Sequence, residues 1–279
     1  GAYGFGEAGP YAGRPAYDDL IQGQTGIAAL SAQQSGDVPR YAPLTLADRA
    51  VGLHVGIALV SAVLHARAAG RGQQVEIPMF EGMAHLVLGD HLGGATFEPP
   101  LGPTGYARLL APHRRPYATA DGYLCLLIYN DKHWRNFFGL IGRPELEQDP
   151  RFCTHGARAA HISEVYAFVA EVISTRPSQE WLDDLARADI PASQLYTVDG
   201  LLQDEHLAAT GFIREMDHPS EGRIRTTAPL GQYQGTPTSL RRPAPRLGEH
   251  SREVLEQAGY DAARIDALVD RGITQDGND

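Results

Sequence analysis

A turn, a short strand and the start of a helix follow one another in the stretch Gly70-Arg71-Gly72-Gln73-Gln74-Val75-Glu76-Ile77-Pro78-Met79-Phe80-Glu81-Gly82. The glycines at its beginning mark a turn, and residues 75–77 are typical of a brief strand. Pro78 suits the first position of a helix, where its missing N–H leaves no hydrogen bond unmade. The pattern therefore predicts a strand-to-helix junction with Glu81 in the first helical turn.

Glu81 has two interpretations at this position. A carboxylate in the first turn lies near the positive end of the helix macrodipole, which favours its ionised form and suits a nucleophile that attacks as an anion. Glutamate is also common in first turns for electrostatic reasons alone. The spacing by itself leaves both interpretations open.

Length and composition are consistent with an enzyme but do not indicate which reaction it catalyses. The chain has 279 residues, of which 43% are hydrophobic, so it can bury a sizeable core and divide into two lobes. Its formal net charge of -10 argues against a general affinity for nucleic acid. No signal peptide opens the chain and no apolar run is interpreted as long enough to span a membrane, which predicts a cytoplasmic protein without a membrane partner. Cys125 and Cys153 are expected to be buried, reduced thiols.

Hydrophobic periodicity predicts most of the elements. Apolar residues recur from Leu46 to Ala69 almost without a charged interruption, which predicts a buried helix. Trp134, Phe137 and Phe138 lie on another expected helix and are typical of a hydrophobic core. The other expected elements are helices at residues 18–30, 133–140, 162–174, 178–188, 198–207, 253–258 and 262–269, and strands at 122–129, 212–215 and 222–225.

Three further motifs contain residue types that can bind a ligand or a metal. Gly4-Phe5-Gly6-Glu7-Ala8-Gly9 matches the letters of a dinucleotide fingerprint, but prolines follow it and no strand precedes it, so it is interpreted as a loop that allows close backbone approach. His113-Arg114-Arg115 is a basic group that suits either a phosphate or an interface. His85, Asp90 and His91 do not share one helical face, so no metal site is expected.

Several separated segments, taken in order, resemble the family III CoA-transferases. These are the CaiB/BaiF and formyl-CoA transferase-like proteins, which share a superfamily with α-methylacyl-CoA racemase. Besides the GRGQ run at 70–73 and the motif Met79-Phe80-Glu81, the resemblance rests on Gly4-Phe5-Gly6-Glu7-Ala8-Gly9-Pro10-Tyr11, Arg14-Pro15-Ala16-Tyr17-Asp18, Leu46-Ala47-Asp48, Asp121-Gly122-Tyr123, Asn130-Asp131-Lys132-His133-Trp134, Asp204-Glu205-His206 and Pro243-Ala244-Pro245-Arg246-Leu247-Gly248-Glu249-His250.

The resemblance implies an α/β fold and an interlocked homodimer. It implies a large Rossmann-like domain built from both chain ends and a smaller α/β domain between them. The expected ranges are 1–95 for the part of the large CoA-binding domain that carries the catalytic carboxylate, 96–115 for a linker, 116–205 for the small domain and 206–279 for the return to the large domain. It also implies that the chain lacks an N-terminal segment of its relatives.

The same resemblance implies the site residues. Glu81 occupies the position of the family's catalytic carboxylate, where the transferases usually have aspartate, so this side chain is one methylene longer. Asp48 and Tyr17 are expected in the pocket or as an acid/base pair, although Asp48 is as well suited to capping the helix that it begins. The residues expected to bind CoA are Gly6, Tyr11, Arg14 and Arg71.

The function that the resemblance implies is transfer of CoA between an acyl-CoA thioester and a carboxylic acid, through an acyl-glutamyl anhydride and a glutamyl-CoA thioester. No permanently bound cofactor or metal is implied, since coenzyme A enters as substrate. A 2-methylacyl-CoA racemase using Asp48 and Glu81 is the first alternative, but its histidine falls at Tyr17, and tyrosine is a poor base at neutral pH. The second alternative is a non-catalytic CoA-binding or dimerisation subunit.

Overall fold

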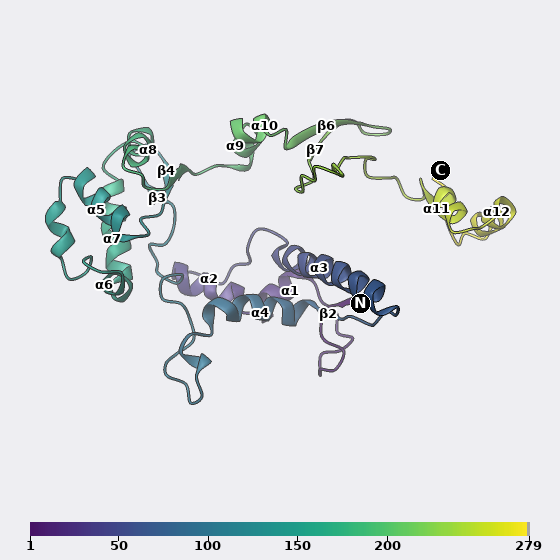
Figure 1. Cartoon of the computed structure of the whole chain (residues 1–279), viewed down its shortest axis with the longest axis horizontal. Helices are drawn as coiled ribbons and strands as arrows, with labels where there is room; N and C mark the ends of the chain where they lie inside the picture. Colours follow the sequence, from purple (N-terminus) through teal and green to yellow (C-terminus); the bar gives the residue numbers. More distant parts are fainter. Residues whose placement is uncertain (278–279) are drawn as a thin grey trace. The chain divides into compact units, whose positions relative to one another are not determined.

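The chain is mixed α/β, as the sequence predicts (Figure 1). A computed structural model describes residues 1–277. They form two compact units, Gly1–Leu195 and a second that begins at Tyr196. The first unit holds two separate hydrophobic cores, one from residues before 90 and one from residues after 115. The predicted ranges 1–95, 96–115, 116–205 and 206–279 remain predictions.

The N-terminal core is built from helices. Helices α1 (Asp18–Gln24), α3 (Leu46–Ala69) and α4 (Met79–His91) pack against one another. Helix α2 (Ile27–Ser35) follows α1 after a turn. The predicted helix at 18–30 is therefore interrupted, because Gly26 adopts a φ of 87°, in the left-handed region that glycine favours. The buried side chains of this core are Phe5, Ile21, Ala47, Val51 and Met83.

Two very short strands tie the chain's beginning to the strand-to-helix junction. Strand β1 (Ala2–Tyr3) pairs in parallel with β2 (Ile77–Pro78). The predicted strand at 75–77 is shifted toward the helix, because β1 offers only two residues for pairing. Pro78 is the last residue of β2 and precedes α4 in extended conformation, so the prediction that it is the first helical residue is wrong by one position.

Helix α3 has the predicted bounds, but the prediction that it is buried is wrong. Only Ala47 and Val51 are buried along its 24 residues. The interpretation that no apolar run is long enough to span a membrane is also wrong, since among the described residues α3 passes that test by length and composition, with 6% of its apolar window buried. The reason is that α1 and α4 cover only part of the helix, so most of its apolar side chains remain exposed.

The start of α3 is capped from a distant residue. The buried carboxylate of Asp18 accepts hydrogen bonds at Oδ1 from the backbone N–H groups of Ala47 at 2.7 Å and Asp48 at 3.2 Å. Its Oδ2 accepts a bond of 2.6 Å from the side-chain amide of Gln22. Asp48 is exposed and its side chain makes no cap, so the capping role considered for it belongs to Asp18.

Replacing Asp18 by alanine should lower the free energy of unfolding by about 2 kcal/mol, the range of a lost helix cap with charge-assisted hydrogen bonds. The loss arises because two N–H groups of α3 and the amide of Gln22 lose their acceptor. Urea denaturation followed by circular dichroism measures it. Asp19→Ala, at the exposed neighbouring position, is the matched control, and an equal loss in both variants would contradict the capping role.

The second core of the first unit combines a small antiparallel sheet with helices. The sheet order is β3-β4-β5, with β3 at Tyr117–Ala118, β4 at Tyr123–Leu126 and β5 at Ala192–Gln194. The helices are α5 (Asp131–Leu140), α6 (His155–Ala160), α7 (Ile162–Ile173) and α8 (Ser178–Arg187). Short 3-10 turns lie at Gly93–Thr96 and Pro144–Gln148.

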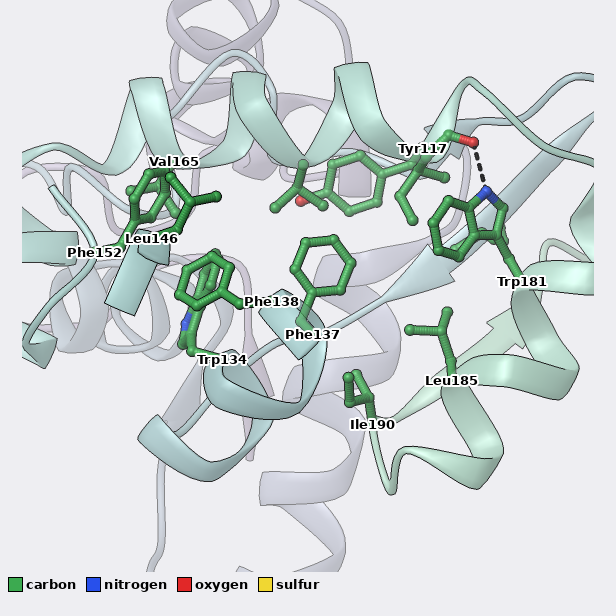
Figure 2. Close-up of a cluster of buried hydrophobic side chains, with 13 residues drawn as sticks. Tyr117, Trp134, Phe137, Phe138, Leu146, Phe152, Val165, Trp181, Leu185 and Ile190 are labelled. Carbon is green, nitrogen blue, oxygen red and sulfur yellow. Dashed lines mark hydrogen bonds between the residues drawn. The ribbon is translucent and has the colours of Figure 1, made fainter. Parts of the chain in front are cut away.

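Aromatic side chains fill this core, as predicted (Figure 2). Trp134, Phe137 and Phe138 are buried on α5, and the rings of Trp134 and Phe152 lie 5.7 Å apart. Trp181 on α8 is buried as well, and its indole N–H donates to the carbonyl of Ile173 at 2.9 Å, the bond drawn in Figure 2. Cys125 is half-buried and Cys153 is exposed, so the expectation of two buried thiols is wrong for Cys153.

The second unit consists of short helices and a hairpin. Its strands β6 (Ile213–His218) and β7 (Gly222–Thr227) are antiparallel, as predicted. The predicted helix at 198–207 is two helices, because the Asp204 carboxylate accepts from the N–H of Leu207 at 2.8 Å and starts a new one. The helices of this unit are α9 (Val198–Leu202), α10 (Glu205–Ala209), α11 (Ser251–Gln257) and α12 (Ala262–Asp270).

Candidate active site

The pairing of β1 with β2 brings the glycine-rich loop against the start of α4. The backbone N–H of Ile77 donates to the carbonyl of Gly1 at 3.0 Å, and that of Phe80 donates to the carbonyl of Gly4 at 3.0 Å. Because the two strands are parallel, the chain leaves both of them at the same edge. The loop that follows β1 and the helix that follows β2 therefore begin side by side.

Glu81 lies in the first turn of α4, as predicted, with an exposed side chain. Its Oε1 accepts a hydrogen bond of 3.1 Å from the backbone N–H of Gly6. Within residues 1–277 no hydrogen bond reaches its other carboxylate oxygen, Oε2. The site therefore presents one anchored and one free carboxylate oxygen, near the positive end of a helix.

Gly6 makes this approach possible because it has no side chain. A Cβ added at Gly6 would lie 2.7 Å from Glu81 Oε1, closer than two such atoms pack. A second carboxylate holds the same loop, since Glu76 Oε1 accepts from the N–H of Glu7 at 2.7 Å. Glu76 is a site residue that the sequence does not predict. Its only signal was an acidic residue next to a short strand, and its loop partner is 69 positions away.

Three aromatic rings form a cluster beside Glu81. The ring centres of Phe5 and Tyr11 are 5.4 Å apart, those of Phe5 and Phe80 are 5.6 Å apart, and those of Tyr11 and Phe80 are 6.1 Å apart. The guanidinium of Arg14 lies 4.3 Å from the centre of the Tyr11 ring, within cation–π distance. Gly6, Tyr11 and Arg14, three of the four residues expected to bind CoA, thus share the loop that contacts the start of α4.

The other expected residues are not joined to this loop. Tyr17 is 72% exposed and stands at the N-cap position of α1. Asp48 is exposed in the first turn of α3, and Arg71 is exposed in the turn after that helix. In the described part of the chain, no hydrogen bond or ion pair links any of these three side chains to Glu81.

Residues 1–277 contain no group of three or more His, Cys, Asp or Glu side chains arranged to hold a metal ion. The Nδ1 atom of His91, one of the residues weighed as a metal ligand, accepts a hydrogen bond of 3.2 Å from the backbone N–H of Tyr106. The groups that the structure brings together at the Glu81 loop are carboxylates, backbone N–H groups and aromatic rings.

Comparison with known proteins identifies relatives of most of the chain. The model of a family described as CoA-transferase family III matches residues 1–251. The succinate–glutarate CoA-transferase of Agrobacterium fabrum is 29% identical over 265 residues, which cover 91% of this chain and 63% of that protein. The formyl-CoA:oxalate CoA-transferase of Rhodopseudomonas palustris is 26% identical over 299 residues, covering 98% of this chain and 68% of that protein.

A solved structure agrees with these sequence relatives. The crystal structure of a CaiB/BaiF family protein from Brucella suis matches with a TM-score of 0.70 and 26% identity, over 92% of this chain and 66% of that chain. An acyl-CoA transferase of Fusarium pseudograminearum is 28% identical over 98% of this chain but only 60% of its own length. The chain thus spans 60% to 63% of the first curated relatives that it matches.

Proposed function

Because the chain belongs to the family III CoA-transferases, we propose that it moves coenzyme A from an acyl-CoA thioester to a carboxylic acid, with Glu81 as the nucleophile. The observation that carries the proposal is the Glu81 carboxylate, anchored at Oε1 by the N–H of Gly6 and free at Oε2. The names of two relatives supply starting substrates, since one is named for succinate and glutarate and the other for formyl-CoA and oxalate.

The proposed reaction proceeds through covalent steps. The carboxylate of Glu81 attacks the thioester carbonyl and expels CoA thiolate, which leaves an acyl-glutamyl anhydride. The thiolate then attacks the glutamyl carbonyl, releases the donor acid as its carboxylate and forms a glutamyl-CoA thioester. An acceptor carboxylate attacks this thioester and expels CoA thiolate, which leaves an acceptor-glutamyl anhydride. The thiolate then attacks the acceptor's carbonyl in this anhydride, which releases the Glu81 carboxylate and yields the new acyl-CoA.

The hydrogen bond from Gly6 supports different roles for the two oxygens of Glu81 in this reaction. Oε2 is unpartnered within residues 1–277, so it is the oxygen placed to attack. Oε1 then becomes the carbonyl oxygen of the glutamyl anhydride and thioester. Negative charge develops on this oxygen each time a nucleophile attacks the glutamyl carbonyl, and a backbone N–H already aimed at it stabilises that charge.

The anhydride must be kept from water, and the exposed side chain of Glu81 shows that these residues alone do not enclose it. The rings of Phe5, Tyr11 and Phe80 supply one apolar wall. We propose that the protein is a homodimer, in which a second copy of the chain completes the enclosure of Glu81. A stripe on α3 supports this, since Leu53, Ile57, Val60 and Leu64 recur at helical spacing and each is at least 60% exposed.

A charge within this stripe should dissociate the homodimer. Ile57→Glu is expected to raise the Kd of the dimer at least about 100-fold, because an unpaired carboxylate would be buried at the interface. Analytical ultracentrifugation of the purified full-length protein measures the Kd. His65→Glu adds the same charge at an exposed position beside the stripe and should leave the Kd nearly unchanged. A monomeric parent protein, or one that requires detergent, would contradict the dimer proposal.

The reaction type is tested by supplying acyl-CoA with and without an acceptor acid in deuterated water. The transferase proposal expects new acyl-CoA only when succinate, glutarate, oxalate or another acceptor is present, and no deuterium at the α-carbon of the donor. Deuterium at the α-carbon without any acceptor would instead identify a racemase. Neither reaction, across the donor panel, would favour a CoA-binding or dimerisation subunit.

A further inference from the structure

A hollow in the second core of the first unit is lined by basic and apolar side chains and by no carboxylate. It consists of two adjoining chambers of about 340 Å³ and about 250 Å³. The larger chamber lies at the lower end of the volume range of small-molecule sites, and the two together lie well within it. The residues that line both chambers, and therefore join them, are Arg108, Leu127, Ile128, Trp134 and Tyr166.

Three arginines of this hollow have no acidic partner. Arg114 and Arg115 are exposed and line the larger chamber, together with the half-buried Arg108. None of the three forms an ion pair within residues 1–277. Unpaired cations gathered at one hollow are unexpected in a chain whose net charge is -10. Arg158 in the smaller chamber differs, because it pairs with Asp131 and donates to the carbonyl of Phe152 at 2.6 Å.

Neighbouring groups hold Arg108 in place without neutralising it. Its Nε donates to the hydroxyl of Tyr166 at 3.1 Å, and its guanidinium lies 5.9 Å from the centre of the Tyr129 ring. Burial opposes the charge of Arg108, but hydrogen bonds with tyrosine hydroxyls outweigh burial and raise its pKa. His113 precedes the other two arginines, and its buried Nδ1 has no hydrogen-bond partner in the described part of the chain. Arg108 is thus held in place, and none of the three arginines has its charge balanced by an ion pair within residues 1–277.

Apolar and aromatic side chains supply much of the remaining wall of the hollow. Trp134 lines both chambers, Val169 contributes to the larger and Val165 to the smaller. An arginine guanidinium matches the planar geometry of carboxylates and phosphates, whereas apolar walls favour a hydrocarbon or aromatic body. We propose that this hollow binds an amphipathic anion, with its carboxylate or phosphate at the three arginines and its apolar body against Trp134.

This binding site goes beyond the proposed CoA transfer. Its lining residues fall between Tyr106 and Val169, whereas the Glu81 loop is made of residues before 82. From the sequence alone, Arg114 and Arg115 suit a phosphate contact and an interface contact equally. Their position at the mouth of an apolar hollow favours the anion.

Isothermal titration calorimetry of the full-length protein tests the site with three probes of similar shape. Phenyl phosphate and 3-phenylpropionate carry the anion, and 3-phenylpropanamide is the neutral control. We expect at least one anionic probe to bind about tenfold or more tightly than the amide, as charge-assisted bonds to arginine predict. Binding of the phosphate alone assigns a phosphate ligand, and binding of the carboxylate alone assigns a carboxylic acid. Equal binding of all three probes, or no binding of either anion, would overturn the proposal.

The double variant Arg114→Gln, Arg115→Gln should bind the anionic probe with about tenfold lower affinity and should bind the amide with unchanged affinity. Both side chains are exposed, so the double variant should keep its melting temperature. Arg135→Gln with Arg271→Gln removes the same charge from exposed positions outside the hollow and should bind like the parent. Equal weakening in the two double variants would show a general charge effect. A changed probe affinity in Glu81→Gln would place the probe at the Glu81 loop and refute a separate site.

Discussion

Replacing Glu81 by glutamine is expected to lower the kcat of acceptor-dependent CoA transfer by at least about 10³-fold, as removal of a covalent nucleophile does. An amide is nearly isosteric with the carboxylate but does not form the anhydride. The carbonyl oxygen of glutamine still accepts the hydrogen bond that Gly6 donates to Glu81 Oε1. The loop should therefore stay in place, and the loss should appear in kcat without a loss of thermal stability.

Glu81→Asp is the matched comparison for this variant. The aspartate variant keeps a carboxylate but moves it back by one methylene from the N–H of Gly6. In the parent protein the nitrogen of Gly6 lies 3.1 Å from Glu81 Oε1. An intermediate loss of about 10- to 100-fold is expected from the misplaced nucleophile. Steady-state transfer rates measure both changes. Substantial activity in Glu81→Gln, above a tenth of the parent rate, would rule Glu81 out as the nucleophile.

Replacing Gly6 by alanine should reduce transfer about 100-fold while hardly changing stability. The new Cβ would lie 2.7 Å from Oε1 of Glu81, so one of the two must move. The carboxylate is the end of a flexible, exposed side chain and moves more easily than the backbone. The fold therefore tolerates the methyl group, but the nucleophile is displaced and loses its N–H donor.

Gly9→Ala separates this steric effect from a general stiffening of the loop. A Cβ at Gly9 would meet only the carbonyl oxygen of Gly6, at 3.5 Å, which is an ordinary contact. This variant should retain nearly the parent kcat. Measured kcat and melting temperature for both glycine variants give the comparison. Equal kcat in Gly6→Ala and the parent would contradict the role of the Gly6 contact.

The local features of the site follow from the sequence because they depend on neighbouring residues. A proline after a short apolar run places the end of β2 and the start of α4 to within one residue, and this puts Glu81 in the first turn. The aromatic core around Trp134 is likewise predictable from helical spacing. The family resemblance supplied the interpretation of Glu81 as more than a first-turn acid.

The long-range features do not follow from local patterns. Gly6 and Glu81 are 75 positions apart, and only the pairing of β1 with β2 brings them together. The cap of α3 comes from Asp18, which is 29 positions from its first partner, whereas local reasoning could consider only Asp48. An apolar sequence likewise does not reveal whether its helix is covered, and α3 is largely exposed in this chain.

The covalent role of Glu81 is tested by mass spectrometry of the full-length protein with an acyl-CoA that supports transfer. The mixture is trapped with hydroxylamine or borohydride during turnover and then mapped by peptide. We predict a mass change that requires the acyl-CoA, lies on the peptide containing Glu81 and is absent from Glu81→Gln. Transfer without any adduct at Glu81, or an adduct on another carboxylate, would contradict this mechanism.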